Sequence, residues 1–404
     1  MTAKRYMSAR QAAAVLGISP ATLYAYVSRG LIRSEAGPDK RARRYHVQDI
    51  ERLKQRREQR RNPDKAARAT LRAGMPVLDS AIALITDTCL YYRGHSALEL
   101  ARQHSFEEVA ALLWSGDLGA ALPVDEGPAL SEACQAVLEQ ADELTPCERM
   151  QIVLPVAGAQ DWRAYDLTAD GVVATGVRIL RLLAAASSGQ QNGGGLAAAL
   201  QQAWAPKQPQ ARRLFEAALI LCADHELNAS SFTARCVAST GATPYAAVTA
   251  GLAALSGPKH GGHVSLVEDF LDQCRGQGGP RSVIAARLQQ AGIIPGFGHI
   301  VYQGADPRAS LLLELLEESF PGDRFLALVR QTVALVEEAT GHHCNIDLGL
   351  GALVQQLGLP PGSAQALFAL GRTAGWIAQV GEEYKRDQLI RPRARYTGPQ
   401  PTSR

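Results

Sequence analysis

The chain has 404 residues, 46% of them hydrophobic and 20% charged, so it can form two or three domains around a large core. No apolar run has the length of a membrane span, and the N-terminal residues lack the apolar stretch of a signal peptide, so we expect a cytoplasmic protein without a membrane partner. Residues 1–68 contain 17 Lys or Arg and 6 Asp or Glu, which gives a net charge of +11. The remaining residues contain 25 Lys or Arg and 33 Asp or Glu, which gives a net charge of −8. Only the first region therefore suits binding to nucleic acid.

The N-terminal residues predict two short helices joined by a tight turn. Ser8 and Gln11 form a capping-box pattern, and Gly17 is a typical stop after the first helix. Ser19 followed by Pro20 is a typical start for a second helix. Two helices with this spacing predict a helix-turn-helix.

The next segment, RSEAGPDKRARRYH, predicts a basic wing of two short strands, and residues 47–61 predict a basic helix. The module resembles the DNA-binding part of MerR-type regulators and the related excisionase-like winged helices. In such modules the second helix reads a groove and the wing contacts phosphates. The side chains expected to contact DNA are Thr22, Tyr24, Tyr26, Arg29, Lys40, Arg41, Arg43 and Arg44. The alternative is a basic surface that is merely solvated, but capping, spacing and charge together favour DNA binding.

The composition changes near Asn62. We therefore predict a winged helix-turn-helix domain at 1–62, a linker at 63–78 and a second domain at 79–404. Long helical patterns dominate the second domain and strand patterns are scarce, so the expected fold class is mainly α. Three segments interrupt the helical pattern with glycine, proline and polar residues, namely ADHELNAS, GPKHGGH and PGFGHIVYQGADPRA. Three others also stand out: HHCNIDLGLGAL has a lone acid among apolar residues, GRTAGWIAQ contains an arginine, and LIRPRARYTG lies near the C-terminus.

These segments supply candidate catalytic residues. Asp347 lies among apolar residues, where a carboxylate becomes a stronger base. His260 and His299 stand in glycine-rich frames, which let the backbone approach a substrate closely, and His225 follows an aspartate.

Three arginines complete the set, because Arg308, Arg372 and Arg391 can hold carboxylates by two-point contacts. Each candidate residue has an ordinary structural explanation when taken singly, as a helix cap, a loop histidine or a surface charge. Together, a base for a C–H proton, histidines for oxygens and arginines for a di-acid suit carbon–carbon bond formation.

The order of the motifs points to a family. Residues from about 79 to 398 resemble citrate synthases and 2-methylcitrate synthases: DHELNASSFTARCVAST, GPKHGG, GFGH-VY, DPRA, NID, GRTAGWIA and RPRARYTG stand in the family's order. The resemblance implies a large helical domain and a small helical domain that closes over the substrate, here at roughly 260–350. It also implies oxaloacetate and an acyl-CoA as substrates, with no metal and no organic cofactor.

The resemblance also implies a role for each candidate. His260 would stabilise the enol of the acyl thioester, Asp347 would remove its α-proton, and His299 would bond and protonate the ketone of oxaloacetate. His225, Arg308 and Arg372 would bind the carboxylates of oxaloacetate. Arg391 matches an arginine that the family supplies from the neighbouring subunit, which implies an obligate homodimer.

The sequence departs from the family pattern on the thioester side. Ile300 and Gln303 stand where the family commonly has Arg and Lys, and His263 where it has Ala. Residues 348–350 are Leu-Gly-Leu in place of an aromatic pair and Ser. The leading hypothesis is a citrate synthase-type enzyme, because His260, His299 and Asp347 are intact, and the length of the acyl chain stays open. The alternative is a DNA-binding regulator whose synthase-like domain senses a di-acid or acyl-CoA with little or no turnover.

The seven cysteines are scattered and include no CxxC pair, which predicts reduced thiols. A metal site could be suspected from His263, His342, His343 and Cys344, but no ligand spacing supports one.

Overall fold

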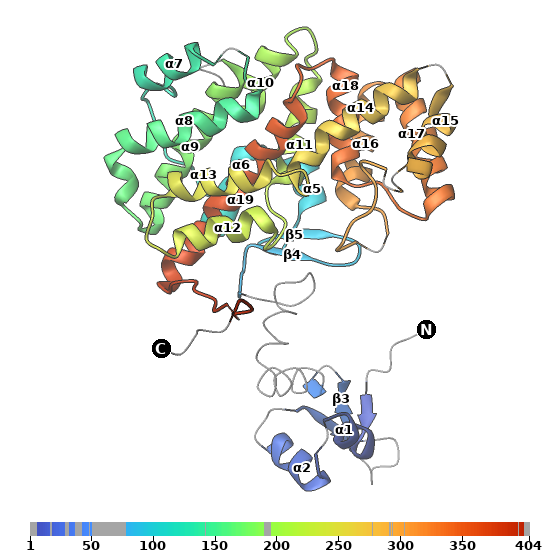
Figure 1. The fold of residues 1–404 in the computed structure, drawn as a ribbon. Coiled ribbons are helices and arrows are strands. Elements are labelled where there is room, and N and C mark those ends of the chain that lie inside the picture. The colour runs from blue at the N-terminus through green and yellow to red at the C-terminus, as the bar shows by residue number, and fades with distance from the viewer. Residues whose placement is uncertain are drawn as a thin grey trace. The chain divides into compact units, whose positions relative to one another are not determined.

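The computed structural model describes residues 6–16, 18–28, 32–36, 43–47, 49–50, 78–141, 143–189, 195–276, 278–290, 292, 294–302, 304–394 and 396–399. The chain divides into two compact units, Met1–Asp79 and Ser80–Arg404 (Figure 1). This division falls within one residue of the predicted start of the second domain. The predicted limit at residue 62 and the linker up to residue 77 lie outside the described residues.

The first unit combines two helices with a three-stranded antiparallel sheet of order β1-β3-β2. Its elements are β1 Tyr6–Ser8, α1 Ala9–Leu16, α2 Pro20–Ser28, β2 Ser34–Ala36 and β3 Arg43–His46. The predicted helix-turn-helix and the two wing strands are confirmed. The sequence did not predict β1, because three residues are too short for a recognisable alternation; it forms by pairing with β3. The wing turn and the basic helix beyond residue 50 lie outside the described residues.

Local capping explains where these helices begin. The backbone N–H of Ser8 donates to Oε1 of Gln11 at 3.0 Å, and the Gln11 N–H donates back to Oγ of Ser8 at 3.4 Å. The Thr22 N–H donates to Oγ of Ser19 at 3.2 Å. A small core then holds the unit together, made of Ala12, Ala13, Leu16, Leu23, Ile32, Tyr45 and Ile50.

The second unit is mainly helical, as predicted. It opens with a small sheet that the sequence did not predict, formed by β4 Ala83–Ile85, β5 Leu90–Tyr92 and β6 His95–Ser96. Its α-helices are α5 Ala97–Gln103, α6 Phe106–Ser115, α7 Glu132–Glu139, α8 Pro146–Gln160, α9 Ala169–Ser188, α10 Leu196–Trp204, α11 Ala211–Cys222, α12 Ala229–Ala238, α13 Pro244–Leu255, α14 Val264–Arg275, α15 Gly279–Gln290, α16 Pro307–Ser319, α17 Arg324–Thr340, α18 Ile346–Leu357 and α19 Ser363–Arg386. Two short 3₁₀ segments are η1 Trp162–Tyr165 and η2 Gly261–His263.

Helix α19 is the central helix of the second unit and packs against α11, α12, α9, α6 and α13 (Figure 1). Small residues let it approach α11 closely: a Cβ on Gly371 would lie 2.5 Å from the carbonyl oxygen of Leu219. A Cβ on Gly375 would overlap the carbonyl oxygen of Ala223. This close packing places Arg372 of α19 beside Cys222 at the end of α11.

Helices α14 to α18 pack against one another beside this core. They fall in the region predicted as a small closing domain, and closure itself stays a prediction. All seven cysteines are free, as predicted.

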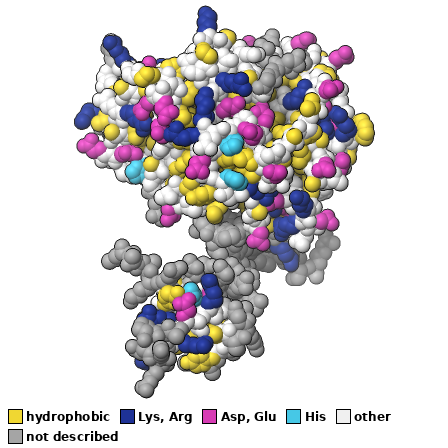
Figure 2. Space-filling model, turned by 180° about the vertical axis from the view of Figure 1, so that it is seen from behind, with side chains coloured by type: hydrophobic (Ala, Val, Ile, Leu, Met, Phe, Trp, Pro, Cys, Tyr) yellow, Lys and Arg dark blue, Asp and Glu magenta, His cyan; other side chains and the backbone are white. Residues whose placement is uncertain are grey.

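One helix corrects an expectation from the sequence. By length and composition α9 could cross a membrane, although no such run was expected. However, 67% of its apolar window is buried inside the unit, as in the core helix of a globular fold. On the face of the second unit drawn in Figure 2, acidic and basic side chains are interspersed rather than segregated by sign.

Candidate active site

The loop that carries His299 is fixed to the segment that carries Asp347. The backbone N–H of Asn345 donates to the carbonyl of Gly296 at 2.9 Å, and the Asn345 side-chain amide donates to the carbonyl of Gly298 at 3.0 Å. Both glycines have positive φ, +82° and +81°, so a side chain at either position would be strained. The glycine frame around His299 is therefore a backbone requirement of this junction.

His299 is held as a neutral hydrogen-bond donor. Its Nδ1 accepts the backbone N–H groups of Val301 at 3.0 Å and Tyr302 at 3.4 Å, which assigns the ring proton to Nε2. Burial, reinforced by the positive charge of Arg308, lowers the pKa of His299 to about 4. The ring therefore presents Nε2–H at neutral pH.

His225 and Tyr302 lie against His299. The ring centroids of His225 and His299 are 5.2 Å apart, and Nε2 of His225 is 3.2 Å from the Tyr302 hydroxyl. Burial, followed by the charges of Arg308 and Arg372, lowers the pKa of His225 well below its usual range. Sequence reasoning did not select Tyr302, because its contact with His225 spans 77 positions and no local pattern marks it.

His260 lies in a second hydrogen-bonded group. Its Nε2 is 2.9 Å from Oγ of Ser230, and Nε1–H of Trp376 donates to the same oxygen at 3.2 Å. Burial and the charge of Arg372 lower the pKa of His260 to about 4, so this ring is also neutral near pH 7. Ser230, at the start of α12, is a further residue that sequence reasoning did not select.

Two buried arginines bring positive charge to this region. Arg308 donates Nε and Nη2 to the Asp306 carboxylate at 3.0 and 2.8 Å, and Asp306 also accepts the Ile346 N–H at 3.1 Å. Arg372 donates Nε to the Cys222 carbonyl at 2.7 Å. Its Nη1 is buried, and no described residue accepts a hydrogen bond from it.

Asp347 is the candidate base. It lies in the first turn of α18, where its N–H donates to the capping side chain of Asn345 at 3.0 Å. Burial raises the pKa of Asp347 to about 7, although the positive charge of Arg308 opposes that shift. A carboxylate of this kind can take up a proton near neutral pH.

The structure therefore brings most of the predicted site residues together. A ring contact and the charges of Arg308 and Arg372 connect the members of this group, which are His225, His260, His299, Arg308, Asp347 and Arg372. Arg391 does not join them: it is exposed in the C-terminal segment that follows α19. Among the described residues, no group of three or more His, Cys, Asp or Glu side chains has the arrangement of a metal site.

Comparison with known proteins places this geometry in a family. The family model described as "Citrate synthase, C-terminal domain" matches residues 71–393. The chain belongs to the citrate synthase family. A second model, "Helix-turn-helix domain", matches residues 6–58, in agreement with the first unit.

Individual relatives agree with the family assignment. The chain is 32% identical over 359 residues to a citrate synthase of Haloferax volcanii, covering 80% of this chain and 94% of that protein. It is 28% identical over 339 residues to a 2-methylcitrate synthase of Corynebacterium glutamicum, covering 76% and 88%. The crystal structure of citrate synthase from Thermotoga maritima superposes with a TM-score of 0.67 at 27% identity, covering 82% and 96%.

The positions that depart from the family pattern have different environments. Ile300, directly after His299, is 82% exposed, whereas Leu348 and Leu350 are buried in the core. Gln303 lies outside the described residues. His263, in η2, is half-buried. Among the departing positions that the structure describes, Ile300 alone has an exposed side chain.

The predicted DNA-contacting residues also differ in how exposed their side chains are. Tyr24 is 54% exposed, and Arg43 and Arg44 are exposed on β3. Tyr26, in contrast, packs partly against the small core, and the Thr22 hydroxyl is 2.9 Å from that of Ser19. Arg29, Lys40 and Arg41 lie outside the described residues.

Proposed function

We propose that the second unit condenses oxaloacetate with an acyl-CoA, most simply acetyl-CoA, in the cytoplasm, giving citrate and free CoA. No metal or organic cofactor takes part in this proposal; the acyl-CoA is a co-substrate. Family membership supports the reaction class, and the site residues support the chemistry.

Nη1 of Arg372, which has no acceptor among the described residues, carries the proposal. A buried guanidinium N–H without an acceptor costs free energy, on the order of 1–3 kcal/mol for a polar group, so this position favours an anionic ligand. Arg308 is the second buried cation, and the neutral ring of His225 lies close to both charges. This arrangement suits a small di-acid whose carboxylates meet two arginines and a histidine.

The reaction follows from the protonation states. Ionised Asp347 takes a proton from the α-carbon of the thioester, and His260 donates a hydrogen bond to the thioester oxygen as the enol forms. The Ser230 hydroxyl, which donates to Oδ1 of Asn228 at 2.8 Å, orients this ring through its 2.9 Å contact with Nε2 of His260. The enol carbon then attacks the oxaloacetate ketone, and Nε2–H of His299 protonates the new alkoxide. Water hydrolyses the resulting thioester and releases CoA.

Release of free thiol tests this proposal directly. The full chain is incubated with oxaloacetate and a panel of acyl-CoAs, and the CoA thiol is measured with a colorimetric reagent. Thiol release that requires oxaloacetate supports the proposal, and the panel gives the acyl preference. Oxaloacetate binding without any thiol release would instead favour a sensor of di-acids.

We further propose a homodimer in which Arg391 completes the site of the partner subunit. The exposed position of Arg391, away from the other site residues, is what such a role requires. The family resemblance supplies the role itself.

We also propose that the first unit binds DNA. The exposed side chains of Tyr24, Arg43 and Arg44, the net charge of +11 over residues 1–68 and the match to a helix-turn-helix model support this second function. A filter-binding assay with random-sequence duplex at low salt tests it, and an absence of retention would contradict it.

A further inference from the structure

The first residues of the second unit are tied to distant carboxylates. Residues 80–85, which we call the strap, include strand β4. The Ile85 N–H donates to Oε1 of Glu226 at 3.2 Å, across 141 positions of sequence. The Ala81 N–H donates to Oε1 of Glu382 on α19 at 2.9 Å. Because β4 is an edge strand, its outward N–H groups are free to make such bonds.

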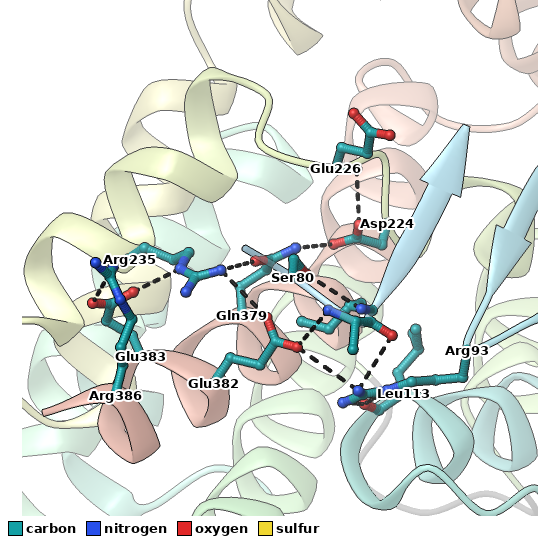
Figure 3. A network of polar contacts seen from close by, with 12 residues as sticks. Ser80, Arg93, Leu113, Asp224, Glu226, Arg235, Gln379, Glu382, Glu383 and Arg386 are labelled. Carbon is teal, nitrogen blue, oxygen red and sulfur yellow. Dashed lines mark hydrogen bonds and ion pairs between the residues drawn. The ribbon is translucent and has the colours of Figure 1, made fainter. Parts of the chain in front are cut away.

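From Glu382 a polar chain continues through the interior (Figure 3). Oε2 of Glu382 is 3.3 Å from Nη1 of Arg235, and that nitrogen also donates to Oε1 of Gln379 at 3.1 Å. The Gln379 amide donates to Oδ2 of Asp224 at 3.3 Å. Arg235 and Gln379 are 1% and 0% exposed, so this chain is shielded from water.

Both connections end on one short turn. Oδ1 of Asp224 accepts the Glu226 N–H at 2.9 Å, which closes the turn over His225. Glu226 has φ of +52°, a left-handed conformation that is unfavourable for a residue with a side chain. Such a conformation persists only where its surroundings hold it. Here the strap holds Glu226, the polar chain holds Asp224, and the ring between them is His225.

We propose that the strap positions His225 for the di-acid, with Glu226 as the positioning residue. This inference rests on the proposed function, in which His225 binds a carboxylate of oxaloacetate. Glu226 acts by fixing the backbone turn, and hence the direction of the His225 ring toward Tyr302 and His299. The hydrogen bond from Ile85 reaches a residue that both adjoins a site histidine and has a strained backbone, which a purely stabilising surface hydrogen bond would not require.

The test replaces Glu226 in the full chain. Glu226→Ala removes the acceptor for the Ile85 N–H, and we expect the KM and Kd for oxaloacetate to rise about tenfold, since a hydrogen bond to a charged group is lost. We expect the KM for acetyl-CoA to change less than about twofold, because that substrate does not meet His225. Glu226→Gln keeps a side-chain oxygen in place and is expected to restore most of the oxaloacetate affinity.

A matched control separates positioning from general stability. Oε1 of Glu107 accepts the Leu196 N–H at 2.6 Å, the same kind of tie elsewhere in the unit. Glu107→Ala is expected to lower the unfolding temperature as Glu226→Ala does, but to leave the KM for oxaloacetate unchanged. An equal rise in that KM for both variants would overturn the proposal.

A double-mutant cycle tests whether the strap is the partner. Ile85→Pro removes the donor at an edge-strand position, where proline is tolerated. If both residues act through one bond, the double variant with Glu226→Ala is no worse than the poorer single variant. If the increases in the KM for oxaloacetate caused by the two substitutions multiply in the double variant, the strap is not the element that positions His225.

Calorimetry with oxaloacetate distinguishes the two proposals. Binding by the parent and weaker binding by Glu226→Ala support the positioning role. Binding by the parent and equal binding by Glu226→Ala overturn that role and leave the proposed function standing. A parent that does not bind oxaloacetate overturns the proposed function and this inference with it.

Discussion

The two units of this protein carry their functional groups in opposite ways. The second unit buries them: Arg308 and Arg372 are 2% and 1% exposed, and each is fixed by a neighbouring oxygen. The first unit exposes Tyr24, Arg43 and Arg44. Buried groups act at short range and tolerate little change, whereas exposed charges act through a screened field and contribute in small, nearly additive steps. The two units should therefore respond to mutation, pH and salt differently.

Removing the base should give the largest effect. Asp347→Asn places a side chain of the same shape that cannot accept the α-proton, so we expect turnover to fall on the order of 10²–10⁴-fold. The unfolding temperature at pH 8 should not fall, because burial disfavours the ionised carboxylate that is removed. A thiol-release assay measures the turnover, and a thermal melt measures the unfolding temperature. Asp170→Asn, at an exposed position of α9, is the matched control and should keep full turnover.

Mixing two inactive variants tests the site that the subunits share. Arg391→Ala and His299→Ala chains should each be nearly inactive, but a mixed dimer has one site that lacks neither residue. Random exchange should restore roughly a quarter of the parental activity, since half of the dimers are mixed and each has one intact site. No recovery despite subunit exchange, measured by mass spectrometry, would contradict a role for Arg391 in the partner's site.

The rate should follow the ionisation of Asp347. Its raised pKa of about 7 means that the base is ionised above pH 7 and protonated below it. At subsaturating acetyl-CoA, kcat/KM should therefore fall about tenfold for each pH unit below 7 and level off above it. The histidines, with pKa values of about 4 at His260 and His299, remain neutral over this range. A flat profile between pH 6 and 8 would show that another group is the base.

Sequence patterns captured the groups that are fixed locally and missed those fixed at a distance. The capping pair Ser8 and Gln11 was predictable because it lies within one helical turn. Six of the seven predicted catalytic and substrate-binding residues lie together. They could be predicted because the motifs that carry them are short and distinctive. The partners Tyr302, Asp306 and Ser230 could not be found, because their roles depend on contacts that only the folded chain creates. The strand β1 was missed for the same reason, as it exists only by pairing with β3.

Ile300, next to His299, resembles the exposed groups of the first unit, because it is 82% exposed. CoA carries several phosphate charges, and a charge-assisted bond is worth about 1.5–3 kcal/mol. We therefore expect Ile300→Arg to lower the KM for acetyl-CoA about tenfold and to leave oxaloacetate binding unchanged, because the arginine fits without repacking. Val124→Arg, at an 87% exposed position, adds the same charge elsewhere and should change neither constant. Adding Gln303→Lys to Ile300→Arg should strengthen the effect.

The smallest effects should come from the exposed charges of the first unit. Arg43 and Arg44 are consecutive exposed residues of β3, and each is expected to displace one counterion from DNA. Replacing either by Ala should weaken binding to random and specific duplex alike, by a few-fold at low salt, and should lower the slope of log affinity against log salt by about 1. The double variant should show the two losses added, since exposed charges couple weakly. Arg212→Ala, an exposed arginine of α11, removes the same charge from the second unit and should leave DNA binding unchanged. If Arg212→Ala weakened DNA binding as much as Arg43→Ala, DNA affinity would not belong to the first unit, and the contrast between the units would fail.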